Sequence, residues 1–135
     1  MTPEFLQQLL AREVVRDFLR FAAVGAVATA AHYAVLIALT ELGGMDPVAG
    51  TVFGFAVGAV VSYTLNRRYT FAVRPAYMRG FVKFAIVIGI GAVLNAAIVA
   101  LFIRVGLHYM VAQVIATGVV LIWNFAGARL IVFRA

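Results

Sequence analysis

Residues 21–40 read FAAVGAVATAAHYAVLIALT, an uninterrupted run of apolar and small side chains without a single charge. A helix that crosses a lipid bilayer needs about 20 residues of this kind. Three more uncharged stretches of similar length follow, at 47–66, 84–103 and 105–128. Little of the 135-residue chain remains outside these stretches. The sequence therefore predicts a protein embedded in a membrane.

The composition excludes most other classes of protein. The chain is 65% hydrophobic and only 12% charged, which is too little charge for the surface of a soluble domain. Closed β-barrels also span membranes, but their strands alternate apolar and polar side chains, whereas these runs are apolar on all sides. We therefore predict an all-α membrane protein with four transmembrane helices. No cysteine is present, which excludes disulfides and thiolate metal sites.

Glycine and proline indicate where the helices end. Gly43-Gly44 and Gly106 mark two short turns, so the spans on either side of each turn form an antiparallel hairpin. The expected helices cover residues 18–42, 48–71, 81–105 and 109–133, with a linker over 72–80.

The first 17 residues are expected to form a short amphipathic helix that starts at Thr2 and Pro3, a favourable cap and first position. They are interpreted either as an interfacial helix at the membrane surface or as a simple extension of the first span. The predicted domains are thus an N-terminal helix over 1–17 and a transmembrane domain over 18–135.

The two hairpins resemble each other in sequence. A shift of 63 residues places Phe18-Leu19-Arg20 on Phe81-Val82-Lys83, and a shift of 62 places Arg67 on Arg129. The repeats cover 18–71 and 81–133. Because a two-helix unit returns the chain to the same side, the repeats have the same orientation in the membrane. Internal duplication of this kind favours a transport function.

The basic residues are distributed unequally between the two sides of the membrane. Ten of the eleven lysines and arginines lie before the first span, between the hairpins or at the end of the fourth span, and only Arg104 lies on the opposite side. The positive-inside rule then places both termini and the central linker in the cytoplasm, with the protein in the cell (inner) membrane. Binding of nucleic acid is disfavoured, because no hydrophilic domain is present.

Small residues recur every four positions in the first two spans. Alanine occupies 22, 26, 30, 34 and 38, and Gly50, Gly54 and Gly58 are followed by Ser62. Such rows allow helix backbones to approach closely. They are interpreted as packing within the chain or, alternatively, as the interface of a homodimer.

The polar residues disfavour several activities. No carboxylate lies inside a span, although exporters of cations usually need one, and the two histidines have no acids nearby to complete a metal site. We therefore expect no metal, no cofactor and no enzymatic activity.

Basic residues gather where the helices are expected to meet the cytoplasm. Arginine binds phosphate oxygens with two parallel hydrogen bonds and keeps its charge. The predicted phosphate-binding residues are Arg20, Arg67, Lys83 and Arg129. The alternative is that they only anchor the helix ends to lipid headgroups.

Five polar side chains lie deeper in the spans: His32, Asn95, Gln113, Thr117 and Asn124. His32 and Asn95 occupy equivalent repeat positions. They are interpreted either as hydrogen-bonded to each other or as lining a polar path for a sugar headgroup. A proton relay through His32 is the weaker alternative.

The end of the second span, SYTLNRRYTF over 62–71, resembles the GtrA-like family of small membrane proteins. Asn124-Phe125, Arg129 and Phe133 at the end of the fourth span extend the resemblance. The family implies four spans and a role in cell-surface polysaccharide or glycolipid synthesis. Its members are commonly proposed to flip polyprenyl-phosphate-linked sugars to the outer leaflet, where the lipid donates its sugar to a glycosyltransferase.

The resemblance implies that the basic residues capture the phosphate and that a polar seam shields the sugar. The seam residues are His32, Tyr63, Asn66, Asn95 and Asn124. The expected partners are the lipid-linked sugar, membrane lipids, a membrane glycosyltransferase and a second copy of the chain. The alternative is an anchor that recruits a polyprenyl-phosphate glycosyltransferase and transports nothing.

Overall fold

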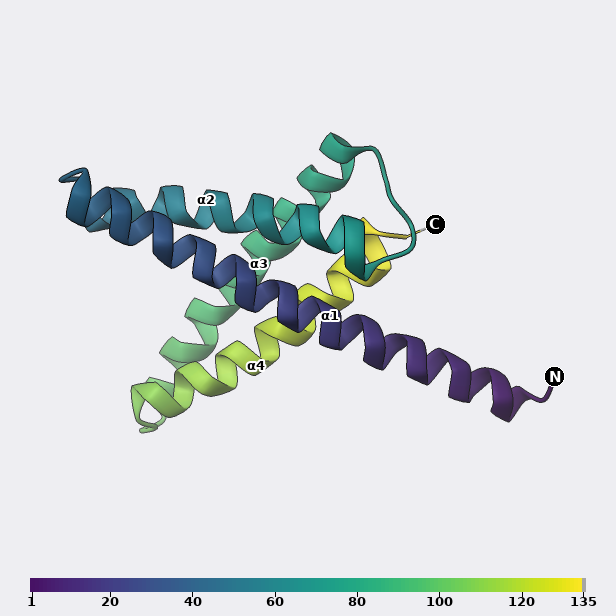
Figure 1. The fold of residues 1–135 in the computed structure, drawn as a ribbon. Coiled ribbons are helices and arrows are strands. Elements are labelled where there is room, and N and C mark those ends of the chain that lie inside the picture. The colour runs from purple at the N-terminus through teal and green to yellow at the C-terminus, as the bar shows by residue number, and fades with distance from the viewer. Residues whose placement is uncertain (135) are drawn as a thin grey trace. The chain divides into compact units, whose positions relative to one another are not determined.

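A computed structural model describes residues 1–134, nearly all of them helical (Figure 1). Four helices are long and apolar enough to cross a membrane. They are α1 (Pro3–Ile37), α2 (Pro47–Leu65), α3 (Tyr77–Arg104) and α4 (Tyr109–Gly127). The prediction of an all-α membrane protein with four spans is confirmed. The chain divides into two compact units, which we call hairpin one (Met1–Ala72) and hairpin two (from Val73 onward).

Three of the helices continue into a π-helical turn. These turns are η1 (Ala38–Leu42), η2 (Asn66–Thr70) and η3 (Ala128–Val132). In η2 the amide of Phe71 donates to the carbonyl of Asn66 at 3.1 Å, and in η3 Phe133 donates to Ala128 at 2.8 Å. The turns η2 and η3 start 62 residues apart, the same offset that pairs Arg67 with Arg129 in sequence. π-Helical turns are rare and often occur at functional sites.

Side chains cap the helices where the sequence has capping residues. Asp46 accepts from the amide of Ala49 at 3.4 Å, directly before Pro47 opens α2. The ring of His108 accepts from Met110 at 3.2 Å at the start of α4. These bonds satisfy amide groups that a helix leaves unpaired at its N-terminus.

Two helix boundaries differ from those expected. The helix α1 runs without interruption from Pro3, so residues 3–17 continue directly into the first span, as in the alternative of a simple extension. Its N-terminal part projects beyond α2 (Figure 1). The helix α3 starts at Tyr77, four residues before the expected start, and the rings of Tyr77 and Phe81 stack one turn apart with their centroids at 6.4 Å.

Glycine brings α1 and α2 into close contact in hairpin one. Gly50, Gly54 and Gly58 are buried along one face of α2. A Cβ atom at Gly54 would lie 2.6 Å from the carbonyl oxygen of His32, and one at Gly58 would lie 3.2 Å from that of Ala28. The glycine row therefore packs within the chain. The alanines at 26, 30, 34 and 38 are exposed and take no part in this contact.

Hairpin two uses small residues on both of its helices. Ala112 and Ala116 of α4 are fully buried. A Cβ atom at Gly127 would collide with the side chain of Val87, and one at Gly91 would lie 2.5 Å from the amide oxygen of Asn124. The indole nitrogen of Trp123 donates to the carbonyl of Val87 at 2.9 Å, which adds a polar bond between the two helices.

The close approach at Gly54 predicts a large effect of one methyl group. Gly54→Ala should destabilise hairpin one by about 1–3 kcal/mol, because the new Cβ meets backbone that cannot move aside. Thermal unfolding of the detergent-solubilised protein measures the effect. Gly25→Ala is the matched control, since nothing lies within 4 Å of its Cβ position, and it should be neutral or stabilising. Equal melting temperatures for the two variants would contradict the packing described above.

Candidate functional site

The turn η2 is held to α1 through Arg20. Its guanidinium donates to the backbone carbonyl of Tyr69 at 3.4 Å. The last carbonyls of a helix have no partner inside it, and a positive charge at that end also interacts favourably with the helix dipole. Arg20 is exposed, so part of its guanidinium can bind another anion.

The side chain of Asn66 stabilises the same turn from inside. It is fully buried, as is Tyr63 one turn earlier. Its amide nitrogen donates to the hydroxyl of Ser62 at 3.3 Å, and its oxygen accepts from the hydroxyl of Thr70 at 2.7 Å. Both ends of the amide are therefore used within one helix. A substrate would reach Asn66 or Tyr63 only if hairpin one opened.

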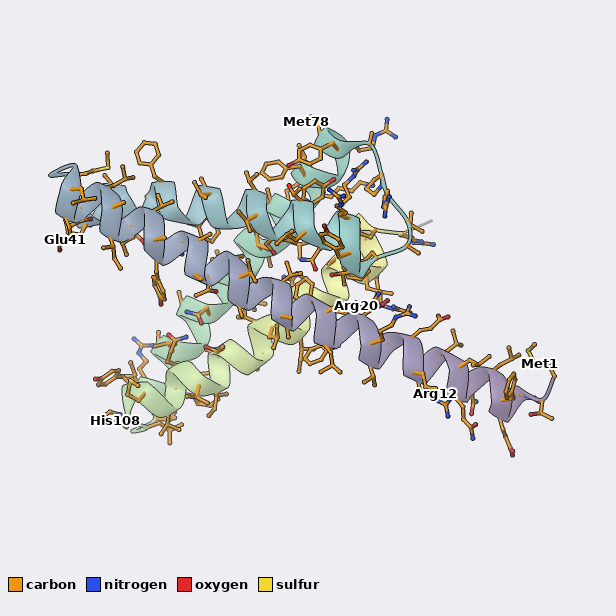
Figure 2. All side chains as sticks on the ribbon, in the orientation of Figure 1. Met1, Arg12, Arg20, Glu41, Met78 and His108 are labelled. Carbon is orange, nitrogen blue, oxygen red and sulfur yellow. The ribbon has the colours of Figure 1, made fainter. Side chains whose placement is uncertain are left out.

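The surface around η2 is strongly basic. Arg67 is half-buried, and the exposed Arg68 lies over the ring of Tyr69 at 5.3 Å from its centroid. On α1, Arg12, Arg16 and Arg20 follow one another at intervals of four residues. Figure 2 shows Arg12 and Arg20 on α1, far along the helix from Glu41 near the turn of the hairpin.

The corresponding end of hairpin two contains a shallow pocket of about 300 Å³. It is lined by Lys83 from α3, by Leu130 and Ile131 from η3, and by Arg134. Two cationic side chains thus share one opening with two apolar ones. Arg129, also in η3, is half-buried and does not line this pocket.

His32 has a partner within hairpin one. Its Nε2 lies 3.0 Å from the hydroxyl of Thr51 on α2. The ring is half-buried, packs edge-on against Phe55 at 6.4 Å between centroids, and covers the backbone at Gly54. This arrangement joins α1 and α2 by a polar bond in the part of the hairpin nearer its turn.

Asn95 likewise has its partner within its own hairpin. Gln113 of α4 donates from its Nε2 to the Oδ1 of Asn95 at 2.9 Å and to the hydroxyl of Thr117 at 3.1 Å. Thr117 in turn donates to the backbone carbonyl of Gln113 at 2.8 Å. We call these three residues the amide cluster. Gln113 and Thr117 are exposed, and Asn95 is half-buried.

Asn124 lies deeper in the α3–α4 contact. Its Oδ1 is buried against Gly91 and has no hydrogen-bond partner among residues 1–134. An unpaired buried amide oxygen is costly, by about 1–3 kcal/mol. It marks a position where a small adjustment of hairpin two would add a bond.

The structure groups the predicted residues by hairpin. In hairpin one, Arg20 bonds to η2, the turn that contains Arg67. In hairpin two, Lys83 shares its pocket with Arg134 and not with Arg129. Arg134 is not among the phosphate-binding residues predicted from the sequence, and Gln113, Thr117 and Thr51 are not among the predicted seam residues. The spacing of Gln113, Thr117 and Asn124 at i, i+4 and i+11 on one helix could have indicated a shared polar face.

Together these groups can bind an amphipathic anion. Each hairpin has a basic end, where a phosphate can be held, and uncharged hydrogen-bonding groups farther along its helices. The uncharged groups can exchange hydrogen bonds with hydroxyls without the large desolvation cost of a buried charge.

A comparison with known families identifies this arrangement. The family described as the GtrA/DPMS transmembrane domain matches residues 20–133, which include all four membrane-crossing helices except the first part of α1. The chain therefore belongs to the GtrA/DPMS transmembrane-domain family, as a multi-pass membrane protein of polyprenyl-phosphate sugar metabolism.

Proposed function

We propose that this protein moves a polyprenyl-phosphate-linked sugar across the membrane for the synthesis of cell-surface polysaccharide or glycolipid. The observation that supports it best is the pocket of Lys83, Leu130, Ile131 and Arg134. In such a lipid the phosphate is bonded directly to the apolar prenyl chain. A pocket with two cations beside two aliphatic side chains matches that junction of charge and hydrocarbon.

The basic residues of both hairpins also indicate the orientation in the membrane. The positive-inside rule places the basic end of each hairpin in the cytoplasm, where lipid-linked sugars are made available to the pocket. The phosphate binds there first, the sugar then moves along the uncharged groups of the spans, and the prenyl chain stays in lipid. Removal of the sugar by a glycosyltransferase on the outer side draws the reaction forward.

A second candidate function is recruitment of a glycosyltransferase without transport. The N-terminal part of α1 favours it, because this part projects past α2 (Figure 1). It also exposes Phe5, Leu6, Leu9 and Leu10. These side chains suit either a partner helix or the membrane surface. Recruitment would depend on them, whereas transport by the purified protein would not.

Removal of the pocket charges should slow transport. In liposomes with a fluorescent polyprenyl-phosphate sugar in one leaflet, Lys83→Gln/Arg134→Gln should lower the rate of transfer about tenfold or more, because hydrogen bonds to a charged group are worth about 1.5–3 kcal/mol each. Arg104→Gln is the control, because it removes a charge from the other end of α3. If the unaltered protein moves the lipid no faster than empty liposomes do, the transport proposal is rejected in favour of recruitment.

Recruitment and transport respond differently to changes in α1. Leu6→Gln/Leu10→Gln should leave transfer in liposomes unchanged, since both side chains lie on the projecting part of the helix. The same variant should reduce co-purification of a glycosyltransferase only if recruitment is a function of this chain. A transfer rate that falls with intact membrane insertion would show that this segment takes part in transport.

The orientation can be tested directly, because the chain has no cysteine. Single cysteines at Leu42 and Leu107, in the two hairpin turns, should react with a membrane-impermeant thiol reagent added outside right-side-out vesicles. A cysteine at Met78, which is exposed near the start of α3, should react only after the vesicles are opened. Labelling of the Met78 position from outside would reverse the proposed orientation.

A further inference from the structure

We propose that the amide cluster of Asn95, Gln113 and Thr117 is a binding site for the neutral, hydroxyl-rich headgroup of a lipid-linked sugar. The inference rests on the transport proposal, and it assigns a second position to the substrate, separate from the phosphate pocket. Hydrogen bonds within the cluster occupy some of its polar groups and leave others unused.

The cluster is only half satisfied by its own members. The two protons of the Gln113 amide go to Asn95 and Thr117, and the hydroxyl proton of Thr117 goes to the backbone of Gln113. The amide nitrogen of Asn95 and the side-chain oxygen of Gln113 have no partner among residues 1–134. The two N–H donors of Asn95 and the side-chain acceptor of Gln113 are thus left unpaired, on two side chains that the Gln113–Asn95 bond holds together at a partly exposed place in the α3–α4 contact.

Lipid chains cannot satisfy these two groups. Exposure of an unpaired amide to hydrocarbon costs several kcal/mol, so a membrane-spanning helix pair is expected to present such groups to something polar. Neither Asn95 nor the residues around it are charged, which disfavours an ionic ligand. A sugar hydroxyl both donates and accepts, and neighbouring hydroxyls would pair with the free donor and the free acceptor at once.

The level of the cluster along the helices separates it from the phosphate pocket. Asn95 is 12 residues beyond Lys83 on α3, or about 18 Å along the helix, and 9 residues before Arg104, or about 14 Å. A monosaccharide phosphate is too short to occupy both sites at once. The two sites are therefore successive positions, with the amide cluster in the half of the span nearer the hairpin turn, on the outer side in the proposed orientation.

The other polar groups of the spans do not offer the same site. The ring of His32 is half-buried, bonds through Nε2 to Thr51 and packs against Phe55, and the oxygen of Asn124 is buried against Gly91. Asn66 uses both ends of its amide within its own helix. The amide cluster combines exposure with unused donors and acceptors.

A labelling experiment tests the site without relying on transport. The full-length protein in liposomes is exposed to a dodecyl glucoside that carries a photoreactive diazirine on the sugar, and the labelled residues are mapped by mass spectrometry. Labelling should gather on α3 and α4 around the amide cluster and fall at least fivefold in Asn95→Leu/Gln113→Met. A probe with the same chain and diazirine but a phosphocholine head should label this region weakly.

Equal labelling by both probes, or labelling unchanged in the double variant, would overturn the inference. So would a double variant that no longer forms a dimer but is still labelled by the sugar probe. Thr29→Val, a change of a polar span residue in hairpin one whose hydroxyl donates only to the Gly25 carbonyl of its own helix, is the control for folding and should keep the labelling. If the variant unfolds, Gln113→Glu provides a second test. It keeps the length and the acceptor and replaces two N–H donors by at most the single O–H of a protonated carboxyl, so at least one donated bond is lost and labelling should still fall.

Transport measurements separate this inference from the proposed function. Asn95→Leu/Gln113→Met should slow transfer of the sugar-bearing lipid and spare transfer of a polyprenyl phosphate without sugar, whereas Lys83→Gln/Arg134→Gln should slow both. Equal slowing of both lipids by the amide variant would assign the cluster a structural role. Specific sugar labelling in a protein that moves no lipid would leave the site standing and reject the transport proposal.

Discussion

The close approach of helix backbones at glycine and alanine is the constraint on which the rest of this structure depends. A bilayer provides no hydrophobic force between helices, because its lipid tails are as apolar as leucine. Each hairpin must therefore be held by van der Waals contact at short range and by hydrogen bonds between helices. Gly54 against the His32 carbonyl in hairpin one, and Gly127 against Val87 in hairpin two, are the points where this contact is closest. The bonds from His32 to Thr51 and from Trp123 to Val87 lie beside them.

Close contact also decides which polar groups remain available. Side chains that lie within the helix contact, such as Asn66, exchange their hydrogen bonds inside the hairpin and stabilise it. Side chains at the margin of the contact, such as Gln113, bond to a neighbour on one side and keep a free group on the other. The same packing that holds each hairpin together thus separates structural polar residues from those that a substrate can reach. This division explains why residues of one chemical type, here asparagine, need not share one role.

Much of the fold could be predicted from the sequence, because the bilayer fixes the length of a span and the turns contain glycine and proline. The four spans and both hairpin turns follow from these features. The start of α1 at Pro3 without interruption could not be predicted, since its amphipathic pattern suits a separate surface helix as well as a continuous one. The π-helical turns could not be predicted either. They are defined by backbone bonds five residues apart, such as that from the amide of Phe71 to the carbonyl of Asn66, and a hydrophobic pattern does not distinguish these from the bonds of an α-helix.

The candidate site was less predictable, because sequence gives the type and approximate depth of a residue but not its neighbours. The repeat paired Arg67 with Arg129 and His32 with Asn95, but it did not show that His32 bonds to Thr51 and Asn95 to Gln113, or that Lys83 shares a pocket with Arg134. Thr51 and Gln113 are 62 residues apart, the same offset as Arg67 and Arg129, so the two bonds occupy equivalent positions and differ in their chemical groups. Such a pattern is expected if a duplicated hairpin keeps the places where its helices bond and changes the side chains there. In hairpin one both partners of the polar pair, His32 and Thr51, are half-buried, whereas in hairpin two Asn95 is half-buried and Gln113 is exposed. A substrate that crosses beside this protein would then meet its uncharged hydrogen-bonding groups mainly on α3 and α4, while hairpin one contributes a basic end and a rigid pair of helices.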